Sequence, residues 1–393
     1  MSALGFIGGI IFIIFYLAAA FYMGKRLFGW FRFVFPKFNL WAFLIVFAIL
    51  VVVAFWALMP LAYPILFIYG VRMVGGYLSG FFMYLFLLFA LGDLVVAAMG
   101  VVKLIKADAV KKARFYAGVA AVLIAIAVTG YGAYNATHII ITNYEVQLSR
   151  DPGGELNIVL VSDLHLGEVF SERRLEQMVA YINSLNPDIV CIAGDIFNDD
   201  FYAIKNPERA AELLRSIETN YGVFASLGNH DTGPTLGSMI NFLEESNVHL
   251  LIDEHVIIDD RVVLIGRLDE IPPWIRGDGF GVMQRVEFSY IMAAVRTDLS
   301  YRGLSGLPIV VIDHNPAHIN EFGSEVDLAL FGHTHRGALF PVNLITNAMF
   351  VTHYGHFQRD SYSPHVIVTQ GVHAWSIPMR VGTNNEIAQI LVR

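Results

Sequence analysis

The sequence has a single cysteine and little charge. Cys191 cannot form a disulfide within the chain, and it lies between Val190 and Ile192 in an apolar run, so we expect a buried core residue rather than a reactive thiol. Charged residues make up 15% of the chain and hydrophobic residues 56%, compared with roughly 45–50% apolar residues in an ordinary soluble protein. Part of the chain is therefore expected to lie in lipid.

Acidic residues and histidines are almost missing from residues 1–138. This part holds ten Lys and Arg but only two acids, Asp93 and Asp108, and the first histidine is His138. Residues 139–393 hold 16 basic and 32 acidic residues, a net charge of −16. Such an acidic domain repels a polyphosphate backbone, so no nucleic-acid partner is expected. We expect two domains, a membrane domain over 1–138 and a second domain over 139–393.

Four apolar runs in the first part predict an N-terminal bundle of four transmembrane helices. Each is long enough to cross about 30 Å of hydrocarbon as a helix. No basic residue precedes the first run and no small-residue cleavage pattern follows it, so we expect a span rather than a signal peptide. A turn rich in Pro and Tyr is expected over 60–73. The expected spans are about 4–23, 39–59, 74–102 and 116–136.

The distribution of basic residues predicts the orientation of this multi-pass protein in the cell membrane. The expected loops 24–38 and 103–115 carry four and five Lys or Arg, whereas 60–73 carries one. Basic loops face the cytoplasm, which makes the second domain extracytoplasmic. Asp93 lies inside the third span, where it could tie helices together or meet the counter-cation of a lipid phosphate. We expect instead a hydrated position near the helix end, because no second buried charge is an obvious partner.

Five apolar runs in the second part each end in a turn that bears Asp, Asn or His. Parallel strands that are buried on both faces have this continuous apolar character, and they deliver functional groups to their carboxyl ends. A strand pair is expected at 139–141 and 144–148, and helices are expected from Ser171, from Asn206 and over about 235–246. This alternation predicts a layered α/β domain. The five runs are 158–165, 188–195, 224–231, 310–314 and 328–335.

The turns contain five sequence blocks in a definite order. They are Asp-x-His at 163–165, Gly-Asp at 194–195, Gly-Asn-His-Asp at 228–231, the lone His314 and Gly-His-x-His at 332–335. In this order they resemble the calcineurin-like metallophosphoesterases over about residues 140–393. The C-terminal segment resembles the membrane-attached cell-envelope branch and transmembrane proteins with a metallophosphoesterase domain. The resemblance implies a four-layer α/β/β/α sandwich and a metal-dependent phosphoric ester hydrolase.

The resemblance also implies which side chains form the site. Two divalent ions are expected to activate a bridging hydroxide for attack on a phosphoryl group. The mixed oxygen and imidazole set has no thiolate, which suits Mn, Fe or Zn and argues against a closed structural zinc site. By the resemblance, Asp163, His165 and His335 hold the first metal, Asp195 bridges, and Asn229, His314 and His333 hold the second.

His230 follows the Asn ligand and is expected to face the substrate. The resemblance gives it the role of stabilising phosphoryl charge and protonating the leaving oxygen, while Asp231 is expected to be an orienting or structural group. In some branches an Asp three residues beyond the bridging carboxylate orients the catalytic His. Here that position is Asn198, followed by Asp199 and Asp200, so the orienting partner remains open.

Three further side chains are weaker candidates. Arg336 and Arg380 either contact a non-scissile phosphate or head group, since guanidinium matches phosphate geometry, or form surface salt bridges. His318, four residues after His314, is expected beside the site or at the surface.

The predicted function is hydrolysis of a phosphomonoester or phosphodiester by a membrane-anchored enzyme. Its partners are expected to be the lipid bilayer and a phosphoester substrate, which the membrane domain suggests is lipid-linked. One alternative is a sugar-nucleotide-lipid pyrophosphate hydrolase, which is disfavoured because family members that prefer such substrates carry Arg in place of His230. Another alternative is a membrane scaffold that retains the metal site without turnover. The oligomeric state is not predicted.

Overall fold

A computed structural model describes residues 3–58, 66–106, 109–167, 171–270 and 284–393. The chain divides into two compact units. The first comprises Met1–Tyr134 and Ser376–Met379, and the second comprises Asn135–Trp375 and Arg380–Arg393.

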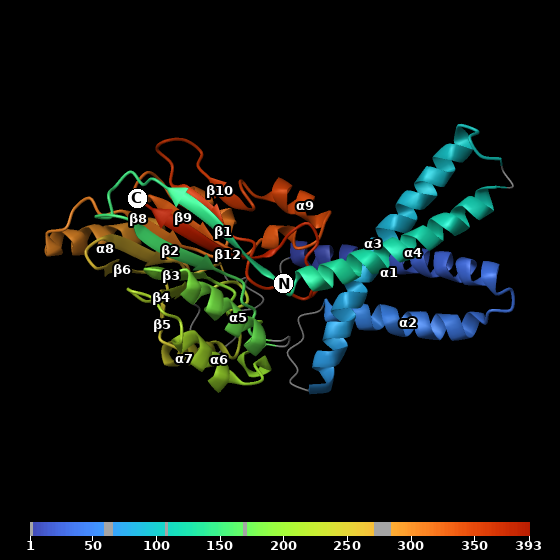
Figure 1. The fold of residues 1–393 in the computed structure, drawn as a ribbon, viewed down its shortest axis with the longest axis horizontal. Helices are drawn as coiled ribbons and strands as arrows, with labels where there is room; N and C mark the ends of the chain where they lie inside the picture. The colour runs from blue at the N-terminus through green and yellow to red at the C-terminus, as the bar shows by residue number, and fades with distance from the viewer. Residues whose placement is uncertain (1–2, 59–65, 107–108, 168–170, 271–283) are drawn as a thin grey trace. The chain divides into compact units, whose positions relative to one another are not determined.

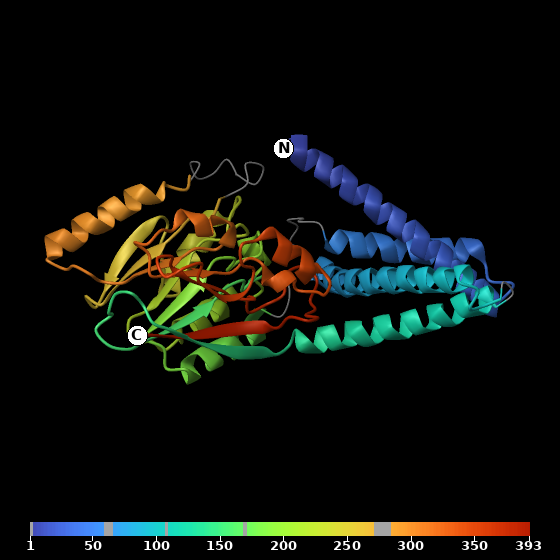
Figure 2. The ribbon, with the colours of Figure 1, turned by 90° about the horizontal axis from the view of Figure 1, so that it is seen from above.

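Among its described residues, the first unit contains four helices that are long and apolar enough to cross a membrane. Successive helices run in opposite directions (Figure 2). Three helices are longer than expected. The first extends to Val34, so three basic residues that were expected in a loop lie on a helix. The third begins at Leu66, inside the expected turn, of which 60–65 lie outside the described residues, and the fourth begins at Val110 rather than near 116. The helices are α1 (Ala3–Val34), α2 (Leu40–Ala57), α3 (Leu66–Val101) and α4 (Val110–Asn135).

Helices α2 and α3 pack closely through small residues. The hydroxyl of Ser79 donates to the carbonyl of Ala54 at 2.8 Å, and a side chain at Gly75 would collide with the backbone of Val53. Small residues allow helix backbones to approach closely in apolar surroundings, where van der Waals contact drives association. The segment Ser376–Met379 joins this pair, because the Ser376 hydroxyl donates to the carbonyl of Ala57 at 3.0 Å.

Asp93 has charged partners on two other helices, so the expectation that it lacks an obvious partner is wrong, although its side chain is partly exposed. Its carboxylate accepts a hydrogen bond from the hydroxyl of Tyr22 at 2.7 Å. It also lies 3.2 Å from Nε of Arg26 on α1 and 3.7 Å from Nε of Arg114 on α4. Arg26 is available because α1 continues past residue 23. Asp93 is therefore a polar tie between α1, α3 and α4.

The second unit contains two six-stranded sheets (Figure 1). In spatial order the first sheet is β1 (Ile139–Val146), β12 (Asn385–Val392), β2 (Leu156–Val161), β3 (Ile189–Ala193), β4 (Val223–Ser226) and β5 (Val248–Leu250). The second is β10 (Gly355–Phe357), β11 (His365–Val368), β9 (Leu328–Phe331), β8 (Ile309–Ile312), β7 (Val262–Gly266) and β6 (Glu254–Ile258).

Three apolar layers confirm the predicted α/β/β/α sandwich. Residues from both sheets, among them Leu160, Ile312 and the fully buried Cys191, form the central core. The outer face of the first sheet packs against α5, α6 and α7, and that of the second packs against α8. These helices are α5 (Ser171–Ser184), α6 (Pro207–Arg215), α7 (Leu236–Glu245) and α8 (Phe288–Arg302), and α9 (Val342–Met349) follows the last catalytic turn.

In the second unit, local signals placed three helices close to their observed bounds, whereas the expected strand pair differs. Helix α6 begins where expected, and the side chain of Asn206 accepts from the N–H of Arg209 at 3.0 Å. The expected strand pair at 139–141 and 144–148 is instead one strand, β1, which pairs in parallel with β12 along its whole length. The partner strand lies at the other end of the chain, which local patterning could not indicate.

Candidate metal centre

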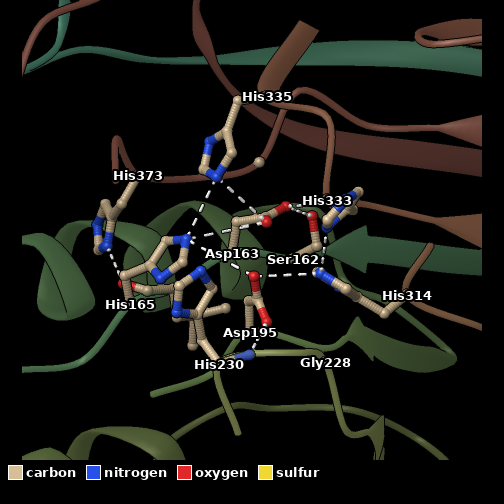
Figure 3. A network of polar contacts seen from close by, with 12 residues as sticks. Ser162, Asp163, His165, Asp195, Gly228, His230, His314, His333, His335 and His373 are labelled. Carbon is tan, nitrogen blue, oxygen red and sulfur yellow. Dashed lines mark hydrogen bonds and ion pairs between the residues drawn. The ribbon is translucent and has the colours of Figure 1, made fainter. Parts of the chain in front are cut away.

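Five strand ends converge on one site. Strands β2, β3 and β4 are mutually parallel neighbours in the first sheet, and β8 and β9 are parallel neighbours in the second. Their carboxyl ends carry the predicted side chains, and the ligand candidates labelled in Figure 3, which are the Asp and His residues of the two groups, point toward a common centre. Asp163 and His165 follow β2, Asp195 follows β3, Asn229 and His230 follow β4, His314 follows β8, and His333 and His335 follow β9.

The first group of ligand atoms comes from β2 and β9. Nε2 of His335 lies 3.3 Å from Oδ1 of Asp163 and 3.2 Å from Nε2 of His165, and Nε2 of His165 lies 3.9 Å from the same carboxylate oxygen. All three ligand atoms lie within 4.8 Å of one another, so one cation could contact all of them.

The second group comes from β3, β8 and β9. Oδ2 of Asp195 lies 3.1 Å from Nε2 of His314, which lies 3.2 Å from Nδ1 of His333. Nδ1 of His314 donates to the carbonyl of Ala193 at 2.8 Å, which leaves Nε2 free to face the centre. Oδ2 of Asp195 is also 4.0 Å from Nε2 of His165. Asp195 therefore lies between the two groups, at the position expected of a bridging ligand.

Unsatisfied buried oxygens fit a metal site. Oδ1 of Asp163 and Oδ1 of Asn229 are buried and have no hydrogen-bond donor among the described residues. Burial of a polar atom without a partner costs roughly 1–3 kcal/mol, and more for a charged group. Divalent cations satisfy such oxygens, and the combination of carboxylate, amide and imidazole suits Mn, Fe or Zn. The residues present therefore fit two divalent ions.

The backbone around the ligands is in a conformation that side chains rarely adopt. Asp163, His165, Asp195, His333 and His335 have φ between 45° and 70°, which typically costs on the order of 1 kcal/mol or more for each residue other than glycine. Hydrogen bonds between the turns hold the strained backbone. The N–H of Asp163 donates to the carbonyl of Gly194, and that of His165 to the carbonyl of Asp195, both at 3.0 Å.

The glycines of the motif blocks allow this close approach. A Cβ on Gly228 would collide with the carboxylate of Asp195, and one on Gly332 would collide with the side chains of Ser162 and Asp163. The Gly-Asn-His-Asp and Gly-His-x-His blocks therefore require glycine for packing against a ligand.

Burial controls the protonation of the imidazoles. Desolvation lowers the pKa of His333 to about 4 and that of His335 to about 3, and it holds the pKa of His165 well below its usual value. These imidazoles are neutral at pH 7, the form that binds metal. Burial opposes ionisation of Asp195, but the nearby His314 and His230 outweigh it and hold the pKa of this carboxyl well below its usual range.

His230 lies beside the ligands, with its orienting partner identified. Its Nδ1 is 2.7 Å from Oδ1 of Asp199, and its ring centroid is 5.3 Å from that of His165 and 5.1 Å from that of Trp375. Burial opposes protonation, but the carboxylates of Asp195 and Asp199 outweigh it and raise the pKa of His230 to about 9. The sequence analysis left the orienting partner of His230 open. The position of Asp199 next to Asn198 was a signal that could have identified it.

Asp231 acts as the structural group expected from its position. Its buried carboxylate accepts backbone N–H groups from Gly228 and Phe197 at 2.8 Å and from Ile196 at 3.2 Å. It thereby joins the turns after β3 and β4.

The two arginine candidates differ. Arg380 is fully buried, and its guanidinium donates to the carbonyl of His335 at 2.9 Å, to that of Gln370 at 2.9 Å and to the side chain of Asn385 at 2.9 Å. These donors are engaged in holding the turn that carries His335, which favours a structural role for Arg380, and its contact with a substrate stays an untested prediction. Arg336 is partly exposed, with its guanidinium 4.3 Å from the Tyr354 ring centroid, and its role as a substrate contact remains a prediction.

His318 lies beside the site rather than in it. Its Nδ1 is 3.5 Å from Oδ2 of Asp313 and 3.8 Å from Oδ1 of Asp269. Asp313 also accepts the backbone N–H of His314 and pairs with Arg285 at 2.6 Å. This group supports the ligand His314 from behind.

Comparison with known proteins agrees with this geometry. The family model for calcineurin-like phosphoesterases matches residues 156–337. The chain is 26% identical over 295 residues to a Danio rerio protein named transmembrane protein with metallophosphoesterase domain, covering 73% of this chain and 65% of that protein. It is 27% identical over 272 residues to an Aquifex aeolicus protein named uncharacterized metallophosphoesterase, covering 69% and 98%. The match spans slightly less than two thirds of the Danio rerio protein.

Solved structures with a similar chain path include a dimetal phosphatase from Danio rerio. It is 13% identical, with a TM-score of 0.34, and the match covers 57% of this chain and 88% of that one. A Haemophilus influenzae NAD nucleotidase is 15% identical with a TM-score of 0.39, and the match covers 57% and 46%. Residues 156–337 therefore match the calcineurin-like phosphoesterase family, and both ligand groups lie within this matched segment.

Proposed function

We propose that the protein hydrolyses phosphomonoester or phosphodiester bonds at a dinuclear metal centre. The observation that carries the proposal is the arrangement of two three-residue ligand groups. Asp195, a member of the second group, faces the first group, and His230 lies beside both. Two divalent cations held by these groups would supply Lewis-acid activation of water and neutralise phosphoryl charge.

The residues of the chain have separable tasks in this reaction. Asp163, Asp195 and Asn229 would provide oxygen ligands, and imidazoles would provide the nitrogen ligands. Because Asp199 occupies Nδ1 of His230, Nε2 is the nitrogen left to donate a proton. As the P–O bond to the leaving group breaks and water adds to phosphorus, that proton passes to the leaving oxygen, and His230 is reprotonated from solvent.

Turnover of aryl phosphates by the purified full chain tests the proposal. With Mn²⁺ present, the wild type should hydrolyse p-nitrophenyl phosphate or its bis-aryl diester, and Asp195→Asn should lose that activity. The control is Asp298→Asn, a partly exposed carboxylate on α8 that pairs with Arg302 and His255. Bound metal without turnover of either substrate by the wild type would favour a membrane scaffold and overturn the proposal.

The four apolar helices support a substrate held at a membrane, and we propose a lipid-linked phosphoester. Detergent-solubilised protein should then show a higher kcat/KM for a phosphoester carried on an acyl or polyprenyl chain than for its water-soluble head group. Equal values for the two would remove the basis for a lipid-linked substrate while leaving the hydrolase assignment intact.

The charge distribution supports an extracytoplasmic catalytic domain. Because Cys191 is the only cysteine and is fully buried, single introduced cysteines report topology without interference. Ser361→Cys in the catalytic unit should react with an impermeant maleimide on intact cells. Lys106→Cys, in the connection between α3 and α4, should react only after permeabilisation. The reverse pattern would place the catalytic domain in the cytoplasm.

A further inference from the structure

A cavity lies in the helical unit, apart from the candidate metal centre. It has a volume of about 250 Å³ and is bounded by α1, α3 and α4. Three cationic side chains reach its wall, Arg26 from α1 and Lys111 and Arg114 from α4. The remaining wall is apolar or aromatic and comprises Gly29, Trp30, Phe33, Phe89, Phe115 and Gly118.

The charges around this cavity are incompletely balanced. Asp93 pairs with Arg26 at 3.2 Å and approaches Arg114 at 3.7 Å, so one carboxylate faces two guanidinium groups. In the part of the chain that the structure describes, no carboxylate pairs with the exposed Lys111. The cavity therefore carries an excess of positive charge, to which the amino-terminal end of α4 adds its dipole.

An unsatisfied donor lies in the same wall. Nε1 of Trp30 is buried and finds no acceptor among the described residues. An indole N–H can only donate, and a buried donor without a partner costs roughly 1–3 kcal/mol. Excess cations and a spare donor are both suited to an anion with several acceptor oxygens.

The cavity lies at the ends of two candidate membrane spans. Lys111 and Arg114 lie in the first turns of α4, and Arg26 to Phe33 lie in the last turns of α1. These are the ends of two candidate membrane spans, Ile7–Val34 and Val110–Asn135. Lipid phosphates lie at this level, and aromatic side chains favour the same boundary between hydrocarbon and water.

We propose that this cavity binds the phosphate of an anionic phospholipid. The ammonium of Lys111 and the guanidinium of Arg114 contact the phosphate oxygens, and the rings of Trp30, Phe33 and Phe115 contact the glycerol and upper acyl carbons. The aromatic wall distinguishes a lipid phosphate from a free phosphate ion, which has no apolar part to bury. The site is separate from the catalytic centre, and its occupancy requires no turnover.

Two adjacent lysines provide a matched test. Lys111 lines the cavity and Lys112, the next residue on the same helix, does not, although both are exposed. Binding of fluorescent dioctanoyl phosphatidylglycerol to the detergent-solubilised full chain is measured for the wild type, Lys111→Gln and Lys112→Gln. Loss of one basic contact should weaken binding about fivefold in Lys111→Gln, and Lys112→Gln should stay within about twofold of the wild type.

Competition identifies the ligand chemistry. Unlabelled dioctanoyl phosphatidylglycerol should displace the probe, whereas dioctanoyl phosphatidylcholine and inorganic phosphate at the same concentration should not. Equal weakening in the two lysine variants would indicate general surface charge and overturn the site. Displacement by inorganic phosphate as potent as that by the lipid would overturn the lipid assignment. Arg114→Gln is a second variant with stronger expected loss, and Lys111→Gln decides the question if that protein does not fold.

Discussion

Nδ1 of His230 lies 2.7 Å from a carboxylate oxygen of Asp199. A backbone hydrogen bond links the same two residues: the N–H of Asp199 donates to the carbonyl of His230 at 3.2 Å. Together the two bonds tie the turn after β3 to the turn after β4 and leave Nε2 of His230 directed to other partners. Asp199 is therefore a positioning residue for the proposed proton donor, and four predictions follow from the site as a whole.

Replacement of Asp199 should change how activity depends on pH. Burial opposes protonation of His230, while Asp195 and Asp199 raise its pKa to about 9. A proton donor loses activity as the pH rises through its pKa, so the fall in kcat should begin near pH 9 in the wild type. Asp199→Asn should lower that pKa and move the fall toward neutral pH, with kcat at pH 7.5 reduced about tenfold.

The control for this experiment is the next residue. The carboxylate of Asp200 accepts from the N–H of Tyr202 at 3.0 Å and has no bond to His230. Asp200→Asn should leave the pH profile unchanged. If both variants lower kcat without moving the alkaline limb, Asp199 contributes to local structure and not to the pKa of His230.

Loss of His230 should depend on the leaving group. His230→Ala should reduce kcat on the order of 10²- to 10⁴-fold for an alkyl phosphoester, whose alkoxide leaves poorly without a proton. The reduction should be much smaller for p-nitrophenyl phosphoesters, because p-nitrophenolate leaves readily unprotonated. The measurement is the ratio of wild-type to variant kcat for each substrate, and equal ratios would argue against His230 as proton donor.

Removal of the metal should abolish activity, and the metal content of variants should show that each ligand group holds one ion. Dialysis against a chelator should remove activity, and Mn²⁺ should restore it. Metal analysis of the wild type should give about two divalent ions per chain, and His335→Ala and His333→Ala should each give about one, since each removes a ligand from one group. His249→Gln, at an exposed histidine on β5, is the control. Full metal content in both ligand variants would contradict the assignment.

The two arginines should give different kinetic results. Arg380→Gln leaves buried carbonyls without a donor and loosens the turn that bears His335, so it should lower the melting temperature and the affinity for one metal. We expect a stability loss of about 2–4 kcal/mol from several lost charge-assisted bonds. Arg336→Gln, at the partly exposed neighbour of His335, should instead raise KM while metal content stays constant. A raised KM with normal stability in Arg380→Gln would instead indicate that Arg380 contacts the substrate.

Much of this protein could be predicted because its information is local. Each metal-binding block is a short apolar strand followed by a turn with a polar side chain. The strand and its turn together span at most eight consecutive residues. The long apolar helices and the cap at Asn206 are equally local. Periodicity and composition therefore predicted the layered α/β domain and the four apolar helices, and the family resemblance of the blocks implied the set of ligand side chains.

Only the tertiary structure decided which distant segments of the chain pair with one another. Asp199 meets His230 from 31 positions away and Arg380 meets His335 from 45 positions away. Asp93 pairs with Arg26 because α1 continues beyond its expected end, and β1 pairs with a strand from the other end of the chain. A side chain's partner depends on which elements pack together, and that depends on the burial of apolar surface by the whole chain. The sequence alone therefore determined which groups were available, and packing determined which of them touch.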